Sequence, residues 1–339
     1  MDTSQSTTIL FGNGLGMALD SEHFLLKTGM SKAWEQLPED SKKRVLIALS
    51  EQKEMPDHEN DLFHIQEILF SIDTLRKYEK DFEWLAADAR TFKKIFQQYV
   101  VNVANHFFSF DGALPEEFTQ PLCNFIEKTS PTPHIVTLNY DRLLYSALWE
   151  KNIFHGSYFE TTLCDGMLNQ GFDRENLKRK FDNSFGWYLH LHGSPLFYSK
   201  NSVILKDGID TFPFSLHDKK RNHLVLTHYK YKPQVITKSY LLDTYWDYFN
   251  YALQESNRFI MFGYSGNDEH INILAREWKN KSPDSHLIEI IEYQNNISDE
   301  DGRIFWNKKF NNLLDFKKDK LIRLPSILNY TSWPKGAGD

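Results

Sequence analysis

The chain has 339 residues, of which 41% are hydrophobic and 15% aromatic. This length and composition suit one large domain, or one domain with a sizeable insertion, around a well-filled core. The formal net charge is −7, from 39 Lys and Arg against 46 Asp and Glu, so we expect no direct nucleic-acid binding.

Cysteine content and hydropathy exclude further classes of protein. The two cysteines, Cys123 and Cys164, cannot build a four-cysteine zinc site or a disulfide framework. The first residues show no signal-peptide pattern, and no apolar run approaches the roughly 20 residues that span a bilayer. We therefore expect a cytoplasmic protein that makes no membrane contact and keeps its thiols reduced.

Short apolar runs of β type recur along the chain, bounded by glycine or polar residues. They span residues 7–11, 134–138, 187–191, 224–227, 258–262, 286–291 and 322–324. Segments of helical periodicity separate several of them, at residues 143–149, 239–253 and 270–278. This alternation predicts an α/β fold with a Rossmann-like, doubly wound, mainly parallel sheet.

The segment between the first two runs has a different character. Apolar residues recur at helical spacing over residues 62–75, where Asp61 is placed to cap the start, and again over residues 92–107. We therefore predict a Rossmann-like core made of residues 1–20 and 125–339. The remaining residues, 21–124, are predicted to form an inserted helical module.

A glycine turn follows the first run. Gly12 and Gly14 allow the backbone to approach a ligand closely, and a helix starting near Leu15 would favour a phosphate. The dinucleotide fingerprint of ordinary dehydrogenases needs a glycine where this chain has Met17, and it needs a second strand where this chain has helices. Hydride transfer is disfavoured, and a tight strand–helix connection is the alternative interpretation.

Asn139 and Asp141 follow the second run. Asp141 fits the role of a helix cap, whereas the carboxamide of Asn139 can both donate and accept hydrogen bonds at a sugar.

Two histidines end the third run. His190 and His192 alternate along one strand and are expected to share a face, and Gly193 would expose the imidazole of His192. Each histidine can instead be structural. No third ligand accompanies the pair, so no metal is expected.

A polar turn follows the run at residues 258–262. It contains Gly263, Tyr264, Ser265, Gly266 and Asn267 and suits diphosphate or ribose oxygens, although it can also simply cap the next helix. Because ligands bind beyond the carboxyl ends of strands in open α/β sheets, we predict that all four loops meet at one pocket.

In their order and spacing, the four segments resemble the motifs of the sirtuin superfamily. Gly12-Asn13-Gly14-Leu15 is similar to its glycine-alanine-glycine-isoleucine turn, and residues 137–141 to its threonine-glutamine-asparagine-isoleucine-aspartate motif. His192-Gly193 resembles its histidine-glycine pair, and residues 263–265 its glycine-threonine-serine turn. Tyrosine after Asn139 is closer to the divergent bacterial sirtuin-like domains of antiphage defence, which hydrolyse NAD+.

The resemblance implies roles for individual residues. Asn139 would position the nicotinamide ribose and the attacking water, His192 would be the general base with a pKa near the working pH, and Asp141 would be a ribose or supporting contact. NAD+ would be bound by Gly12, Asn13, Gly14, Leu15, Gly193, Gly263, Tyr264, Ser265 and Asn267.

One departure from the sirtuin deacetylases narrows the function. They carry a four-cysteine zinc ribbon after the histidine-glycine pair, and here no cysteine follows Gly193, so no zinc is expected. The absence favours hydrolysis of NAD+ itself over peptide deacetylation.

The resulting hypothesis is an NAD+ glycohydrolase that acts as an antiphage defence effector. An NAD+ or ADP-ribose sensor without turnover, and an NAD-dependent protein deacylase, are the alternatives. The resemblance further implies control by assembly, as a homo-oligomer or with a DNA-translocating ATPase of the HerA type.

Overall fold

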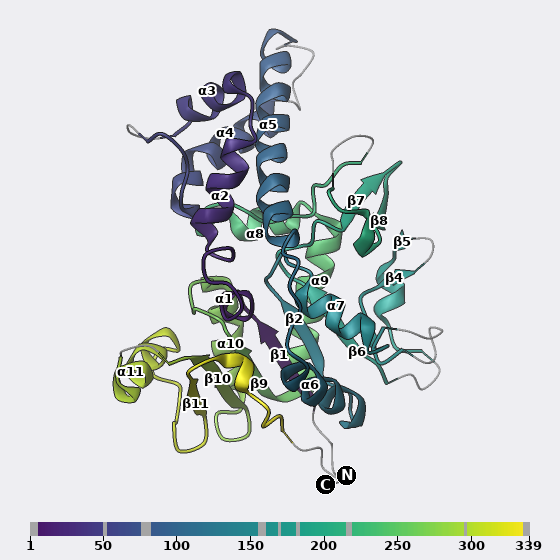
Figure 1. Cartoon of the computed structure of the whole chain (residues 1–339), viewed down its shortest axis with the longest axis vertical. Helices are drawn as coiled ribbons and strands as arrows, with labels where there is room; N and C mark the ends of the chain where they lie inside the picture. Colours follow the sequence, from purple (N-terminus) through teal and green to yellow (C-terminus); the bar gives the residue numbers. More distant parts are fainter. Residues whose placement is uncertain are drawn as a thin grey trace.

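A seven-stranded sheet forms the centre of the molecule (Figure 1). The structure is a computed structural model that describes residues 6–49, 53–75, 83–154, 161–168, 171–180, 184–214, 219–294 and 297–334. The strand order is β11-β10-β9-β1-β2-β6-β3, and every neighbouring pair is parallel. The strands are β1 Ser6–Phe11, β2 His134–Thr137, β3 Leu163–Cys164, β6 Gly186–His190, β9 Ser256–Phe262, β10 Leu287–Tyr293 and β11 Lys320–Leu324.

Helices cover both faces of this sheet. All six residues of β1 are buried, as expected for an apolar strand enclosed on two sides. Phe249 of α9 (Tyr240–Glu255) packs against Phe259, whereas Phe118 of α6 (Glu116–Lys128) packs against Phe262, three positions further along β9. Side chains three positions apart on a strand point to opposite faces, so the predicted doubly wound α/β fold is confirmed.

The remaining elements surround the sheet. The helices of the core are α1 Gly14–Met17, α7 Leu143–Glu150, α8 Lys232–Thr237, α10 Glu269–Lys281 and α11 Asp299–Lys309. Two small antiparallel pairs join β4 Met167–Leu168 to β5 Gly171–Phe172 and β7 Phe197–Lys200 to β8 Val203–Lys206. Short 3₁₀ turns lie at η1 Glu59–Leu62, η3 Arg174–Leu177, η4 Ile209–Thr211, η5 Tyr229–Tyr231 and η6 Ile327–Asn329.

One predicted strand is wrong. Residues 224–227 do not join the sheet, and Leu224 makes only an isolated antiparallel bridge to Gly193. Their apolar side chains are buried for another reason: Leu224 packs with Val101 and Ala104, and Val225 packs with Leu242. Burial alone therefore produced a pattern that resembles a strand.

The helical module stands at one end of the molecule (Figure 1). It contains α2 Leu26–Glu35, α3 Glu39–Ile47, α4 Phe63–Leu75 and α5 Glu83–Phe108. Asp61 does cap a helix start, because its Oδ2 accepts hydrogen bonds from the backbone of Asp57 and His58, but the capped turn is η1, just ahead of α4.

The predicted end of the module at residue 124 falls inside α6. Because Phe118 of that helix packs on the central sheet, we propose that the core resumes before α6. Among the helices of the described ranges, none is both long and apolar enough to cross a membrane.

Candidate functional site

The turns after β1 and β9 touch at the point where the strand order reverses. Chain connections run from β1 toward β2 on one side and reach β9 on the other, which makes this edge the topological switch point of the sheet. The backbone N–H of Gly14 donates to the carbonyl of Gly263 at 2.9 Å. A Cβ on Gly14 would lie 2.6 Å from the Cα of Gly263, so the close approach requires glycine.

This contact uses part of the glycine turn's hydrogen-bonding capacity. The N–H groups of Gly12, Gly14 and Leu15 donate to the carbonyls of Phe262, Gly263 and Gly12, and the Leu15 side chain is buried in the core. Asn13 is exposed and its Nδ2 donates to the carbonyl of Phe24. The helix that follows, α1, is a single turn. These N–H groups are therefore used within the protein. The turn shapes the surface of the site more than it offers hydrogen-bond donors to a ligand.

Asn139 stands at the end of β2, next to the glycine turn. Its backbone N–H donates to Thr137 Oγ1 at 3.1 Å, and its Nδ2 donates to the carbonyl of Gly12 at 3.1 Å. Its Oδ1 is buried and has no hydrogen-bond partner among the described residues. An oriented amide with an unpaired acceptor is a group that a bound ligand can satisfy.

Asp141 is also buried, and its carboxylate bonds the backbone at the start of the next helix, α7, whose N-cap residue is Arg142. Its Oδ1 accepts from the N–H of Leu143 at the start of α7, at 2.9 Å. Burial raises the pKa of this carboxyl to about 6. Of the two interpretations of Asp141, this hydrogen bond to the start of α7 favours the structural one.

His192 lies just past the end of β6, in a tight backbone arrangement. Its carbonyl accepts from the N–H of Val225 at 3.0 Å. Gly193 has φ +83°, and a Cβ there would lie 1.7 Å from the carbonyl oxygen of His223. A residue with a side chain cannot replace Gly193 without moving this segment, so the glycine sets the position of the imidazole before it.

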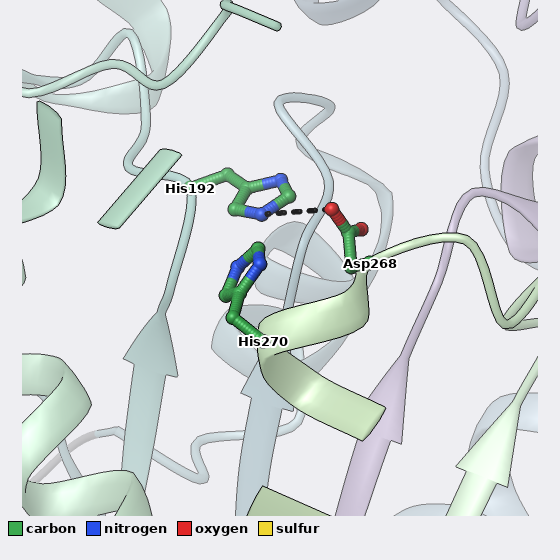
Figure 2. A group of neighbouring side chains, drawn as sticks. All are labelled: His192, Asp268 and His270. Carbon is green, nitrogen blue, oxygen red and sulfur yellow. Dashed lines mark ion pairs between the residues drawn. The ribbon is translucent and has the colours of Figure 1, made fainter. Parts of the chain in front are cut away.

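The imidazole of His192 faces the carboxylate of Asp268 and the ring of His270 (Figure 2). His192 Nε2 is 3.9 Å from Asp268 Oδ1, and the two imidazole centroids are 6.1 Å apart. Both Nε2 atoms are buried and lack a hydrogen-bond partner within the described part of the chain. His192 therefore has a free acceptor or donor next to an acid.

Asp268 belongs to a buried charge network that reaches the helical module. Lys232 Nζ is 2.5 Å from Asp268 Oδ1 and 3.0 Å from Glu59 Oε2, and only 3% of Lys232 is exposed. Asp268 occupies the N-cap position of α10 but makes no side-chain capping bond, so its carboxylate is turned to Lys232 and His192 instead.

Burial and charge set the protonation states here. Burial lowers the pKa of His192 to about 3, although Asp268 opposes the shift, and it lowers the pKa of His270 to about 4. The expectation of a His192 pKa near the working pH is therefore wrong, because the ring is desolvated. Burial raises the pKa of Asp268, but His192 and Lys232 together lower it more, to about 2.

In the turn after β9, one side chain is buried and structural, whereas others are exposed to solvent. Tyr264 is buried, and its hydroxyl donates to Asn272 Oδ1 at 3.0 Å, which shapes the turn. Ser265 and Asn267 are exposed and free to meet a ligand from outside. Gly263 and Gly266 have φ of +60° and +72°, which lets the turn fold back over the sheet edge.

His190 does not share the surroundings of His192. Its ring lies among Tyr145, Tyr188 and Phe197, and both of its nitrogens are buried and unpaired among the residues described. The strand ends at His190, so the alternation that predicted a shared face does not govern the placement of His192.

Several residues of the site were not singled out from the sequence. The sequence predicts no role for Asp268, Lys232, Glu59 or His270. A lysine rarely becomes fully buried unless it is paired, and its two partners here lie 36 and 173 positions away, at Asp268 and Glu59. No local sequence signal reports such a pairing.

The fold and the site define a Rossmann-like α/β protein with a candidate ligand site at the switch point of its sheet. The family model of the SIR2-like domain matches residues 133–314, more than half of the chain, and the chain belongs to this family. The match begins with β2 and includes Asn139, His192 and the turn after β9. The family includes NAD-dependent enzymes, which indicates an NAD-related function. A search of curated proteins found no match.

Proposed function

We propose that the chain is an NAD+ glycohydrolase, which cleaves NAD+ with water to nicotinamide and ADP-ribose. One observation carries the proposal: Asn139 Oδ1 and His192 Nε2 are buried, unpaired among the described residues, and placed past the ends of adjacent strands beside the switch point. Buried polar atoms in native proteins normally have partners, so their availability points to a bound ligand and water.

The proposed reaction breaks the bond between the nicotinamide nitrogen and ribose C1′. Nicotinamide leaves as a neutral molecule and the ribose carries the positive charge. Asn139 holds the ribose and the attacking water through Oδ1, while its Nδ2 stays bonded to Gly12. The water oxygen forms the new bond to C1′, and its proton passes to His192 Nε2 and then to solvent.

His192 acts here mainly as a hydrogen-bond acceptor for the water. An oxocarbenium-like sugar is a strong electrophile, so the water needs orientation more than a strong base. Once the ring takes the proton, the carboxylate of Asp268 at 3.9 Å stabilises the imidazolium. We place Asp141 outside the reacting atoms, as the residue that fixes the turn between Asn139 and α7.

The rest of NAD+ is proposed to extend over the switch point. Gly12, Gly14, Leu15, Gly193, Gly263 and Tyr264 form the surface through their backbone path. Asn13, Ser265 and Asn267 are exposed and supply polar side chains for the diphosphate and ribose oxygens.

Nicotinamide release from NAD+ tests the assignment. Removing a positioned acid–base group costs about 10²–10⁴ in rate, so His192→Ala and Asn139→Ala should lose detectable turnover. The matched controls are His64→Ala and Asn280→Ala, two exposed helical positions, which should turn over like the unmodified chain. Retained turnover in both site variants, with an intact fold, would refute the roles of Asn139 and His192.

The two alternative functions predict different results in the same assay. A sensor that binds NAD+ or ADP-ribose gives saturable binding with no nicotinamide release under any condition. A protein deacylase releases nicotinamide only when an acylated peptide is added. Release from NAD+ and water alone supports the glycohydrolase and excludes both alternatives.

The cellular role proposed is antiphage defence by depletion of NAD+. Its support is the resemblance of residues 137–141 and 263–265 to the divergent bacterial domains, together with the missing zinc ribbon. Such an effector must be silent until triggered, so we propose control by homo-oligomerisation or by an ATPase partner of the HerA type in the cytoplasm. Nicotinamide release measured against protein concentration, with and without such a partner, tests this control, since a fully active monomer contradicts it.

A further inference from the structure

We propose that His192, Asp268 and His270 form a binding site for a divalent transition-metal ion, represented by Zn²⁺, and that the bound ion inhibits NAD+ hydrolysis. One ring nitrogen of each histidine and one carboxylate oxygen lie within 4.8 Å of one another (Figure 2). Two imidazoles and one carboxylate are a known ligand set for zinc, with open positions left for water. The inhibitory part rests on the proposed function, whereas the binding part does not.

Two buried nitrogens supply the second observation. His192 Nε2 and His270 Nε2 have no hydrogen-bond partner among the residues described, and the exposed fraction of His192 is 6%. Leaving buried polar atoms unpaired is unfavourable, and a metal ion would satisfy both.

The charge around the cluster favours a cation. Lys232 bonds Asp268 Oδ1, but Glu59 offsets the ammonium charge at 3.0 Å. Asp268 Oδ2 makes no hydrogen bond within the described part of the chain, because the Lys232 bond goes to Oδ1, and it is available as the third ligand. One ammonium between two carboxylates leaves a net charge near −1.

Small side-chain movements would complete the coordination. Metal–nitrogen distances are about 2.0–2.1 Å for zinc, so the ligand atoms must draw together from their present spacing. His192 and His270 belong to different segments, the end of β6 and the first turn of α10. A zinc ion bound to His192 Nε2 would block the nitrogen that we assign as the hydrogen-bond acceptor for the attacking water.

Direct metal binding by the full chain, free of any tag, is the decisive measurement. Calorimetry with Zn²⁺ should show one site, and Co²⁺ should give visible absorption bands of a low-symmetry nitrogen–oxygen site. His270→Ala should weaken Zn²⁺ binding by more than the roughly 10–100-fold that changes to outer-shell partners cost. His64→Ala, an exposed histidine of α4, is the matched control and should bind Zn²⁺ like the unmodified chain.

The inhibitory part has its own readout. With each protein compared with its own zinc-free rate, Zn²⁺ should abolish nicotinamide release by the unmodified chain and should leave most of the zinc-free rate of His270→Ala. His270→Gln serves as a second variant if the alanine variant fails to fold. Absence of a stoichiometric Zn²⁺ site, or equal binding by the His192→Ala and His270→Ala variants and the unmodified chain, overturns the metal site. If Zn²⁺ binds as expected but NAD+ is not hydrolysed, the proposed function fails and the metal site stands.

Discussion

His192 carries an unusual combination for a proposed proton acceptor, because it is buried, neutral and next to an ionised acid. With a pKa of about 3, the ring stays unprotonated across the physiological range. The rate of NAD+ hydrolysis should therefore be constant from pH 8 to pH 5, where a histidine with the ordinary pKa of about 6.5 would already have lost most of its acceptor form.

Steady-state kcat between pH 5 and pH 8 checks this. Two site carboxyls could add an inflection in this window: Asp141, with its pKa of about 6, and Glu59, whose pKa is raised by burial, so the profile should also be recorded for Asp141→Asn and Glu59→Gln. A fall centred near pH 6.5 that persists in both variants would contradict the neutral, desolvated state of His192.

Asp141 should also make folding stability depend on pH. Its pKa rises from 3.8 to about 6 on folding, so the folded state holds the proton more tightly. The contribution of Asp141 to the free energy of unfolding is fully present below pH 3.8 and is lost as pH rises through 6. At about 1.36 kcal/mol per pKa unit, it amounts to about 3 kcal/mol in all. Asp141→Asn keeps the acceptor for Leu143 and cannot ionise. Relative to the unmodified chain, the free energy of unfolding of this variant should increase by up to about 3 kcal/mol between pH 4 and pH 8.

Urea unfolding at the two pH values measures this gain. Asp40→Asn, at an exposed position of α3, is the control and should change stability by less than about 0.5 kcal/mol at either pH. A difference between Asp141→Asn and the unmodified chain that does not grow with pH would show that Asp141 is solvated.

At the scale of elements, the turns after β1 and β9 contact each other through their backbones. A Cβ on Gly14 would meet backbone atoms of Gly263 at 2.6–2.7 Å, and backbone cannot rotate away as a side chain can. Gly14→Ala should therefore destabilise the chain by about 1–3 kcal/mol and weaken NAD+ binding, because the two turns are pushed apart.

Gly208→Ala is the matched control, since a Cβ there would meet no atom within 4 Å. It should leave stability unchanged or raise it by about 0.4–1 kcal/mol through the unfolded chain. Thermal unfolding and NAD+ titration of both variants decide the matter. Equal behaviour of the two would show that the turns can separate at no cost.

Strands could be predicted from the sequence where an apolar run is both buried and paired with neighbouring strands. The runs at 7–11 and 258–262 became β1 and β9 because each is enclosed on both faces and paired on both edges. The run at 224–227 is equally apolar but fills a gap between α5 and α9 instead of pairing, and sequence alone does not distinguish these cases. The two-residue strand β3 is too short to leave a pattern.

The same division applies to the candidate site. Asn139 and His192 could be singled out because polar residues directly past strands report the edge of the sheet. Lys232 and Glu59 could not, because their role arises from pairing between the core and the module, which the fold alone creates.

At the scale of the whole molecule, the helical module is tied to the segment that follows His192. Its α4 residues Gln66, Glu67 and Asp73 bond Thr227, Tyr231 and Lys238 at 3.0, 2.9 and 2.6 Å. That segment also holds His192 in place, since the N–H of Val225 donates to its carbonyl. The module therefore restrains one wall of the candidate site.

This restraint should control access of NAD+. The exposed fractions of Asn139 and His192 are only 7% and 6%. Because both side chains are almost fully buried, we expect NAD+ to reach them when the wall opens. Loosening the module should raise the population of the open form.

The double variant Glu67→Gln, Asp73→Asn tests this gate. Surface pairs are worth about 0.2–1 kcal/mol each, so weakening two should raise kcat/KM for NAD+ by about twofold to thirtyfold while kcat stays constant. The control is Glu39→Gln, Asp88→Asn, which removes the same charges from pairs with Lys42 and Arg44 that lie wholly inside the module. Because those pairs do not reach the core, kcat/KM should not change. Equal kcat/KM in the two double variants would mean that the module does not gate the site, and the opening would have to be sought in the turn after β9.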